Sequence, residues 1–329
     1  MRKISCLILC LIFLLVCGPK HDDIERVIED GVEVIMNHLE PYDIREEPST
    51  LVLEEMFTID TEKDEIAKVG LTDIDDFDVD SAGSIYFFQN RESDVNLIYK
   101  FDNNGNFMTS LGKRGQGPGE IHTPMHQRIT SQDEIPVQSY GIPNLYVFDR
   151  DGALIRETQI SLNIDGSFVP LENGNYLLFR DYFDPTFRHR YDVLSLYNSK
   201  WEEIKELDRI DYGPFIRITP KKKGSPRVFI YEVTDKLIYV GHENRGYEIL
   251  IFDLNGNLLK KIKKEYKAAK VPDEFKENLI GNFGPYRDKL VIPDEMPPFH
   301  YFFLDDVGRL YVKTYEIGEK KHEYIHDVF

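Results

Sequence analysis

One short sequence pattern occurs three times in this chain of 329 residues. Each copy has an apolar run ending in Phe-Asp, two further residues, a glycine and a second apolar run. The copies are Tyr99-Lys-Phe-Asp-Asn-Asn-Gly105-Asn-Phe107, Tyr146-Val-Phe-Asp-Arg-Asp-Gly152-Ala-Leu154 and Leu250-Ile-Phe-Asp-Leu-Asn-Gly256-Asn-Leu258. Apolar runs joined through a glycine predict β-hairpins, because glycine readily adopts the positive φ that such turns need. Self-similarity at roughly 40–50 residues predicts stacked units.

Each unit is predicted to be a four-stranded antiparallel meander, which is the blade of a β-propeller. The first unit contains strands over 74–79, 84–88, 96–101 and 106–111. The other predicted units cover 127–160, 167–207 and 227–264, and a last one begins near His300. The stretch 265–298 fits a helix over 273–279 and a weak blade around 289–292. Roughly 280 residues at about 45 per blade predict an all-β, six-bladed propeller, with five blades as the alternative.

The last unit has no predicted fourth strand after the strand at 323–329. A strand without a unit is predicted at Leu51–Ile59, with Leu51, Leu53, Phe57 and Ile59 on one face. We expect this strand to pair with 323–329 and to close the ring, because closure removes the edges that invite aggregation.

The first seventeen residues have the features of an export signal. Arg2 and Lys3 precede the uncharged apolar run Ile4–Val16. This run fits a signal peptide and is short for a membrane-spanning helix, which needs about 20 residues. The following Cys17-Gly18 resembles the end of a bacterial lipobox, although Val16 stands where a small residue is usual. We predict lipidation of Cys17, with an ordinary cleaved signal or a retained anchor as alternatives.

Residues 18–47 are predicted to form a linker between the anchor and the propeller, which covers 48–329. Within the linker, apolar residues at helical spacing predict an amphipathic helix over Asp22–Leu39: Ile24, Val27, Ile28, Ile35 and Leu39. Asp22 or Asp23 can cap its start. We expect this helix to pack on the propeller or to act as a spacer.

The charge and the cysteines exclude some partners and sites. The formal net charge is −18, and nucleic-acid binding depends on neutralising phosphates with Lys and Arg, so nucleic acid is not expected as a partner. The three cysteines are Cys6, Cys10 and Cys17. The predicted propeller therefore has no disulfide and no thiolate metal site.

The segment Leu111-Gly-Lys-Arg-Gly115-Gln-Gly-Pro-Gly-Glu120 looks like the turn of NHL-type six-bladed β-propellers. It is especially similar to that of the bacterial six-bladed β-propeller lipoproteins. The resemblance implies a six-bladed ring, export and surface binding, but no shared catalytic set. Relatives in the wider fold include metal-dependent lactonases and lyases, whose metal ligands have no matching positions here.

Two segments are candidates for ligand binding, because aromatic residues and arginines favour recognition surfaces and loops on a rigid scaffold often carry function. The first is the predicted loop 181–190, with Tyr182, Phe183, Phe187, Arg188 and Arg190. The second is the segment Met296-Pro-Pro-Phe299-His300-Tyr301, with Phe299 and His300.

A third candidate is an acidic group on the first predicted strand. Asp76, Asp78 and Asp80 alternate, and grouped carboxylates suit Ca²⁺. The alternative is a solvated inner strand followed by a turn acid, and the run does not match an EF-hand loop.

The sequence contains no convincing pair of nucleophile and base. We therefore expect an exported, lipid-anchored, monomeric binding or scaffold module for a protein, peptide or glycan. It should contact the membrane through its anchor only and need no cofactor, with Ca²⁺ as the alternative. The rival hypothesis is a metal-dependent hydrolase or lyase with its site at the central tunnel.

Overall fold

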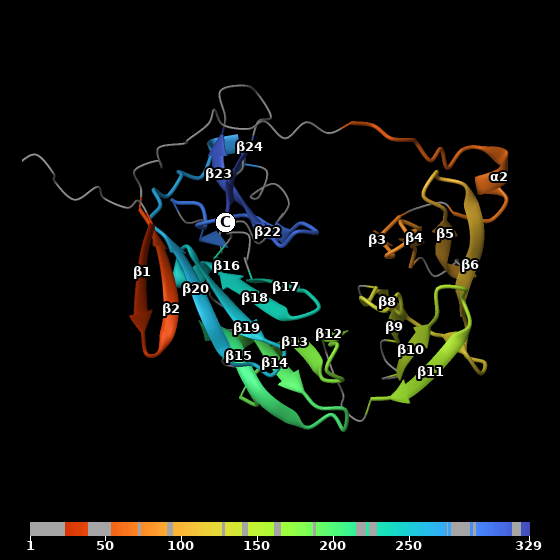
Figure 1. Cartoon of the computed structure of the whole chain (residues 1–329), viewed down its shortest axis with the longest axis horizontal. Helices are drawn as coiled ribbons and strands as arrows, with labels where there is room; N and C mark the ends of the chain where they lie inside the picture. The colour runs from red at the N-terminus through yellow and green to blue at the C-terminus, as the bar shows by residue number, and fades with distance from the viewer. Residues whose placement is uncertain are drawn as a thin grey trace, which may run out of the picture.

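A computed structural model describes residues 24–38, 54–71, 74–90, 95–126, 129–139, 144–160, 166–186, 189–214, 222–223, 229–274, 276–277, 290–291, 294–317 and 324–329. These residues form five consecutive blades, each built on an antiparallel meander, around a central axis, with β3, β8, β12, β17 and β22 nearest the centre (Figure 1). The fold is an all-β propeller, as the repeat predicts. We number the sheets blades 1 to 5 in chain order.

The blades begin and end close to the predicted units. Blade 1 contains β3 (Asp76–Val79), β4 (Ile85–Phe88), β5 (Asn96–Phe101), β6 (Phe107–Arg114) and the short parallel β7 (Glu120–Ile121). Blade 2 contains β8 (Pro124–His126), β9 (Ile135–Ser139), β10 (Asn144–Phe148) and β11 (Leu154–Gln159). Blade 3 contains β12 (Gly166–Pro170), β13 (Tyr176–Phe183), β14 (His189–Tyr197) and β15 (Glu203–Pro214). Blade 4 contains β17 (Phe229–Val233), β18 (Leu237–His242), β19 (Glu248–Asp253) and β20 (Leu258–Lys264). Blade 5 contains β22 (Tyr301–Leu304), β23 (Leu310–Ile317) and β24 (Tyr324–Val328).

A few short elements lie outside the blades. They are α2 (Asp64–Ala67), the 3₁₀ helix η1 (Glu243–Arg245), and β16 (Lys222–Lys223) paired in parallel with β21 (Leu290–Val291). The weak blade predicted around 289–292 thus corresponds to a two-residue strand. None of the helices in the described part of the chain is long and apolar enough to cross a membrane.

The repeated Phe-Asp pattern is explained by the turns between the third and fourth strands. In these turns the aspartate Oδ1 accepts hydrogen bonds from the backbone N–H groups two and four residues ahead, at 2.8–3.0 Å: the aspartates are Asp102, Asp149 and Asp253. The glycine three residues after each has a φ of +80° to +89°. Blade 3 makes the same turn with Asn198, and Trp201 takes the glycine position at a φ of +64°.

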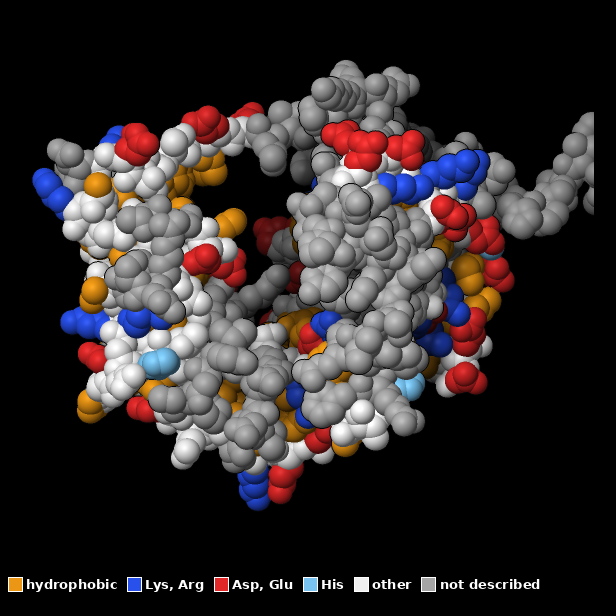
Figure 2. Space-filling view, turned by 180° about the vertical axis from the view of Figure 1, so that it is seen from behind, with side chains coloured by type: hydrophobic (Ala, Val, Ile, Leu, Met, Phe, Trp, Pro, Cys, Tyr) orange, Lys and Arg blue, Asp and Glu red, His pale blue; other side chains and the backbone are white. Residues whose placement is uncertain are grey.

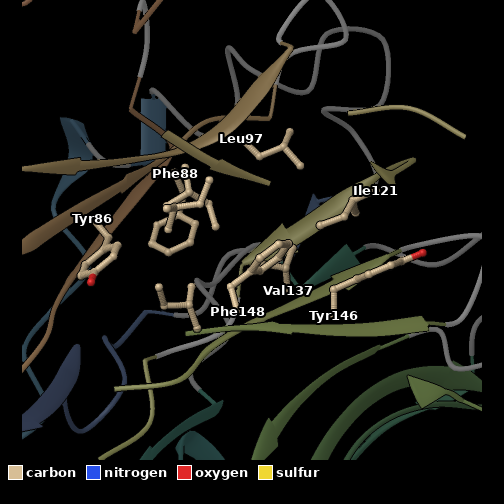
Figure 3. Close-up of a cluster of buried hydrophobic side chains, with 10 residues drawn as sticks. Tyr86, Phe88, Leu97, Ile121, Val137, Tyr146 and Phe148 are labelled. Carbon is tan, nitrogen blue, oxygen red and sulfur yellow. The ribbon is translucent and has the colours of Figure 1, made fainter. Parts of the chain in front are cut away.

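The hydrophobic core lies in the seams between neighbouring blades. Figure 3 shows the seam of blades 1 and 2, where Phe88 and Leu97 face Val137 and Phe148. Three further clusters fill the seams of blades 2 and 3, 3 and 4, and 4 and 5. Blades 2, 3 and 4 therefore have two apolar faces each, which fits their mostly apolar third strands.

The predicted ring closure is wrong for the residues that the structure describes. Residues 54–60 form no strand, and β24 is the last strand of a three-stranded sheet. Instead, the Phe57 and Ile59 side chains lie against Gly105 of blade 1, and Ile59 joins the cluster that contains Tyr99. Alternating apolar residues can be buried on a sheet face as well as in a strand pair, and here they cover blade 1. Leu51 and Leu53 lie outside the described residues.

The predicted amphipathic helix over 22–39 is also wrong, because the described part forms a β-hairpin of β1 (Ile24–Glu29) and β2 (Val32–Asn37). Asp30 and Gly31 both have positive φ, which is the two-residue turn that Asp-Gly favours. Strand β2 pairs in parallel with β20 and extends blade 4 to six strands (Figure 1). Glu29 and Glu33 of the hairpin form ion pairs with lysines of β20. β-Branched residues and pairing with a basic edge strand override the helical spacing.

Candidate functional site

The two faces of the ring are built differently. One face carries the tight turns that join the first to the second and the third to the fourth strands. The opposite face carries the links between second and third strands and the connections from blade to blade. We call this the crossover face. The predicted binding segment 181–190 lies on this face, because it links the second and third strands of blade 3.

Most of the predicted loop 181–190 is an extension of blade 3. Strand β13 runs to Phe183 and β14 starts at His189, so the two strands continue into the predicted loop. Tyr182 pairs with Tyr191, and Phe183 pairs with Arg190. Phe187 and Arg188 lie outside the described residues.

One face of this extension carries alternating aromatic rings and guanidinium groups. The Tyr182 and Tyr191 rings are 5.5 Å apart, and the Arg209 guanidinium lies 4.9 Å from the Tyr191 ring centre. The Arg180 guanidinium lies 5.5 Å from the ring centre of Tyr182 and 5.9 Å from that of Tyr197. We call these five residues the tyrosine–arginine ladder.

Carboxylates hold the ladder in place. Arg209 donates to Glu206 from both Nε and NH2, the Nε bond being 2.8 Å long, and Arg180 lies 3.7 Å from Glu203. The Glu206 hydrogen bonds raise the pKa of Arg209 further above its usual range. Burial raises the pKa of Tyr197 to about 12, against the opposing charge of Arg180. The phenol therefore keeps its proton at neutral pH, and the two hydrogen bonds to Glu206 orient the Arg209 guanidinium.

The other face of the extension presents Phe183, with 36% of its surface exposed. Its cross-strand neighbour Arg190 donates from Nε to the Asp181 carboxylate at 2.7 Å, and from NH2 to the second carboxylate oxygen. Arg190 thus fixes the hairpin through Asp181. Among the candidate residues of this segment that the structure describes, Phe183 is exposed, and Tyr182 and Arg190 are half-buried.

The second predicted segment is split between core and surface. Phe299 is wrong as a binding residue, because its side chain is fully buried between blades 4 and 5, 5.6 Å from the Tyr247 ring. His300 is exposed, and its ring lies 5.5 Å from the Tyr315 ring. Partial burial, and secondarily Lys313, lowers the pKa of His300. Successive side chains of this segment point in opposite directions, so Phe299 lies in the core while His300 lies at the surface.

The predicted metal group Asp76, Asp78 and Asp80 does not converge. Asp80 is buried in a turn, where it accepts hydrogen bonds from the Ser84 N–H at 2.8 Å and from the Tyr86 hydroxyl at 3.0 Å. Although burial opposes the effect, these hydrogen bonds hold the pKa of Asp80 below its usual value. Asp78 accepts from the Ile129 N–H at 2.6 Å. Figure 2 shows acidic side chains beside the central opening, but the described residues contain no group of three metal-ligating side chains.

Sequence reasoning missed most of the ladder. Arg180 lies just before the predicted loop, Tyr191 and Tyr197 lie on the next strand, and Arg209 lies on the one after. The available signal was the alternation of Arg180 and Tyr182, which places both on one face of a strand. Their partners depend on the strand register, which the sequence does not reveal.

The model of the 6-bladed beta-propeller family matches residues 58–222, which is half of the chain. This chain belongs to the 6-bladed beta-propeller family. The match begins in the segment that covers blade 1 and extends past blade 3. The structure shows five blades in its described residues, one fewer than the family description.

Solved structures with similar folds are distant in sequence. A protein of Bacteroides fragilis NCTC 9343 named for its suspected export has 14% identity and a TM-score of 0.46, with 76% of this chain and 64% of that protein covered. Virginiamycin B lyase from Staphylococcus aureus has 10% identity and a TM-score of 0.35, with 77% and 82% covered. An auxiliary nutrient binding protein from Bacteroides ovatus has 11% identity and a TM-score of 0.33, with 73% and 56% covered. None of the curated proteins matches the chain.

Proposed function

We propose that this protein is an exported, lipid-anchored, non-catalytic binding module that presents the crossover face of its propeller to a protein or peptide ligand. The observation that carries the proposal is the tyrosine–arginine ladder on the extension of blade 3. Tyr and Arg are enriched at the energetically dominant positions of protein interfaces. Tyr also supplies a large contact area at a low cost in conformational entropy.

The ladder is pre-ordered, which supports a role in binding. Arg209 is already hydrogen-bonded to Glu206, Arg180 lies 3.7 Å from Glu203, and the rings of Tyr182 and Tyr191 pack together. Ordering mobile side chains on binding costs roughly 0.5–1.5 kcal/mol for each side chain. A surface that is ordered before the ligand arrives avoids much of this cost.

Export and anchoring are supported by the sequence alone. The charged start, the apolar run Ile4–Val16 and Cys17 fit a lipoprotein signal, and these residues lie outside the described structure. Lipidation of Cys17 would tether the chain a few residues before β1, which starts at Ile24.

Site-specific photocrosslinking in native membranes tests the proposal. A photoreactive phenylalanine analogue is placed at Phe183, beside the ladder, or at Ile155, an exposed residue on the outer strand of blade 2. We expect a discrete crosslinked product from position 183 alone. Adding Tyr182→Ala and Tyr191→Ala should abolish it without lowering the melting temperature. The same product from both positions, or none from either, would reject the ladder as the binding surface.

A further inference from the structure

We propose that the seam between blades 1 and 2 holds a second ligand site, for a small organic cation that carries an ammonium group on a compact apolar body. The site lies two strands or more away from the ladder, on other blades. A test of this site is therefore independent of the binding function proposed for blade 3.

The site is a cavity of about 350 Å³ at the crossover face. Its walls come from the start of β3, the end of β4, the start of β5, and strands β8 and β9 of the next blade. Small-molecule sites typically have volumes of about 300–1,000 Å³. A ligand with one ring or a short alkyl chain would fit.

The floor of the cavity is apolar. It is formed by Phe88, Leu97, Ile98 and Val137, whose side chains belong to the core of this seam, together with Pro124 of β8. Figure 3 shows Phe88 and Leu97 of blade 1 opposite Val137 of blade 2. Such a floor favours the hydrocarbon part of a ligand, because its contact removes apolar surface from water.

The rim of the cavity is acidic. Asp75 and Asp76 line it, and its lining residues in the described part of the chain include no Lys, Arg or His. The Asp75 carboxylate is oriented by one hydrogen bond, in which Oδ2 accepts from the Asn90 N–H at 2.7 Å, and it forms no ion pair with a described residue. The Asn90 side-chain oxygen already accepts from Arg114 at 2.7 Å. A ligand that enters over this rim therefore meets the Asp75 carboxylate as an acceptor, while the nearby Arg114 is bound to Asn90.

The combination selects an organic cation over a metal ion. Ca²⁺ requires about six to eight oxygen ligands, whereas most of this cavity's wall is hydrocarbon. An ammonium group bonded to an apolar body satisfies both parts, since the ammonium donates to Asp75 while the body covers the floor. The net charge of −18 also raises the local concentration of cations.

A matched pair of probes tests this assignment. Cyclohexylammonium and the neutral cyclohexanol are titrated into the full chain in detergent, with methyl groups labelled for NMR. We expect saturable shifts of the Leu97, Ile98 and Val137 methyl signals with the ammonium, and at least tenfold weaker binding of the alcohol. Asp75→Asn should weaken ammonium binding about tenfold, equal to about 1.4 kcal/mol, and leave alcohol binding unchanged.

Two controls make each outcome decisive. Asp151→Asn removes the same charge from an exposed turn of blade 2, remote from the cavity, and should bind the ammonium like the unmodified protein. Asp76→Asn provides a second rim variant if Asp75→Asn lowers the melting temperature. Equal affinity for both probes, or equal effects of the rim and control variants, would overturn the ionic recognition. Shifts confined to methyl groups of other seams, or no saturable shift, would overturn the site.

Discussion

Gly152 has a positive φ and packs closely against the neighbouring blade, so replacing it by alanine should destabilise the protein in two ways. Its φ of +89° is disfavoured for residues with a Cβ atom, at roughly 1–2 kcal/mol. An added Cβ would also lie 2.3 Å from Cδ2 of Leu111, a buried residue of blade 1. Overpacking of this kind adds about 1–3 kcal/mol. We therefore expect Gly152→Ala to lower the free energy of unfolding by about 2–5 kcal/mol in urea denaturation, the sum of these two terms.

Gly174→Ala is the matched control. Gly174 has a similar φ of +78° in a turn of blade 3, but no atom lies within 4 Å of the position that an added Cβ would take. This variant should lose only the backbone contribution of roughly 1–2 kcal/mol. The difference between the two variants measures the packing of the turn against the neighbouring blade. If Gly174→Ala were as destabilising as Gly152→Ala, the glycine would be required for the turn alone, and the seam contact would be irrelevant.

Three further predictions concern other parts of the chain. Trp201→Gly should relieve a backbone φ of +64°, but it also removes a buried ring that is stacked 4.3 Å from the Tyr176 ring. Because large-to-small changes in a core cost about 3–5 kcal/mol, calorimetry should show a net loss of stability. Asp208 is buried, which raises its pKa, but His242 and Arg245 outweigh this and hold it below its usual value. Its stabilising contribution should thus be complete above about pH 4 and be lost as the pH falls towards the lower folded-state pKa, so Asp208→Asn should weaken the pH dependence of unfolding in this acidic range. Cys17→Ser should abolish labelling by acyl chains and partitioning into detergent, and unchanged fractionation would contradict the lipid anchor.

The blades could be predicted from the sequence because their signals are local. The Asp and Gly of each turn lie three residues apart, and the Oδ1 hydrogen bonds reach no further than four residues ahead of the aspartate. Trp201 shows how far the pattern can degenerate, since the Asn198 side chain preserves the turn without a glycine.

The N-terminal hairpin was missed for a different reason. Ile24, Val27 and Ile28 fit a helical face as well as a strand, and the deciding contact is with β20, more than 200 residues later in the chain. The local signals against a helix are the Asp30-Gly31 turn and the β-branched residues on both sides of it. The same limit applies to the ladder, because the register that brings Tyr182 to Tyr191 and Arg209 to Tyr191 depends on two strand pairings.

The net charge of −18 does not by itself show which carboxylates can bind a ligand. Several aspartates are occupied by their own turns: Asn106 hydrogen bonds lower the pKa of Asp102, and, although burial opposes it, those of Asn257 lower the pKa of Asp253. Other acids are paired with Lys or Arg, as Glu29 and Glu33 are with β20. Asp75 differs, because its carboxylate borders a cavity with an apolar floor and has no cationic partner among the described residues. Recognition should depend on such individual carboxylates, so neutralising Asp75 should change binding of a cation far more than neutralising a turn acid of equal charge.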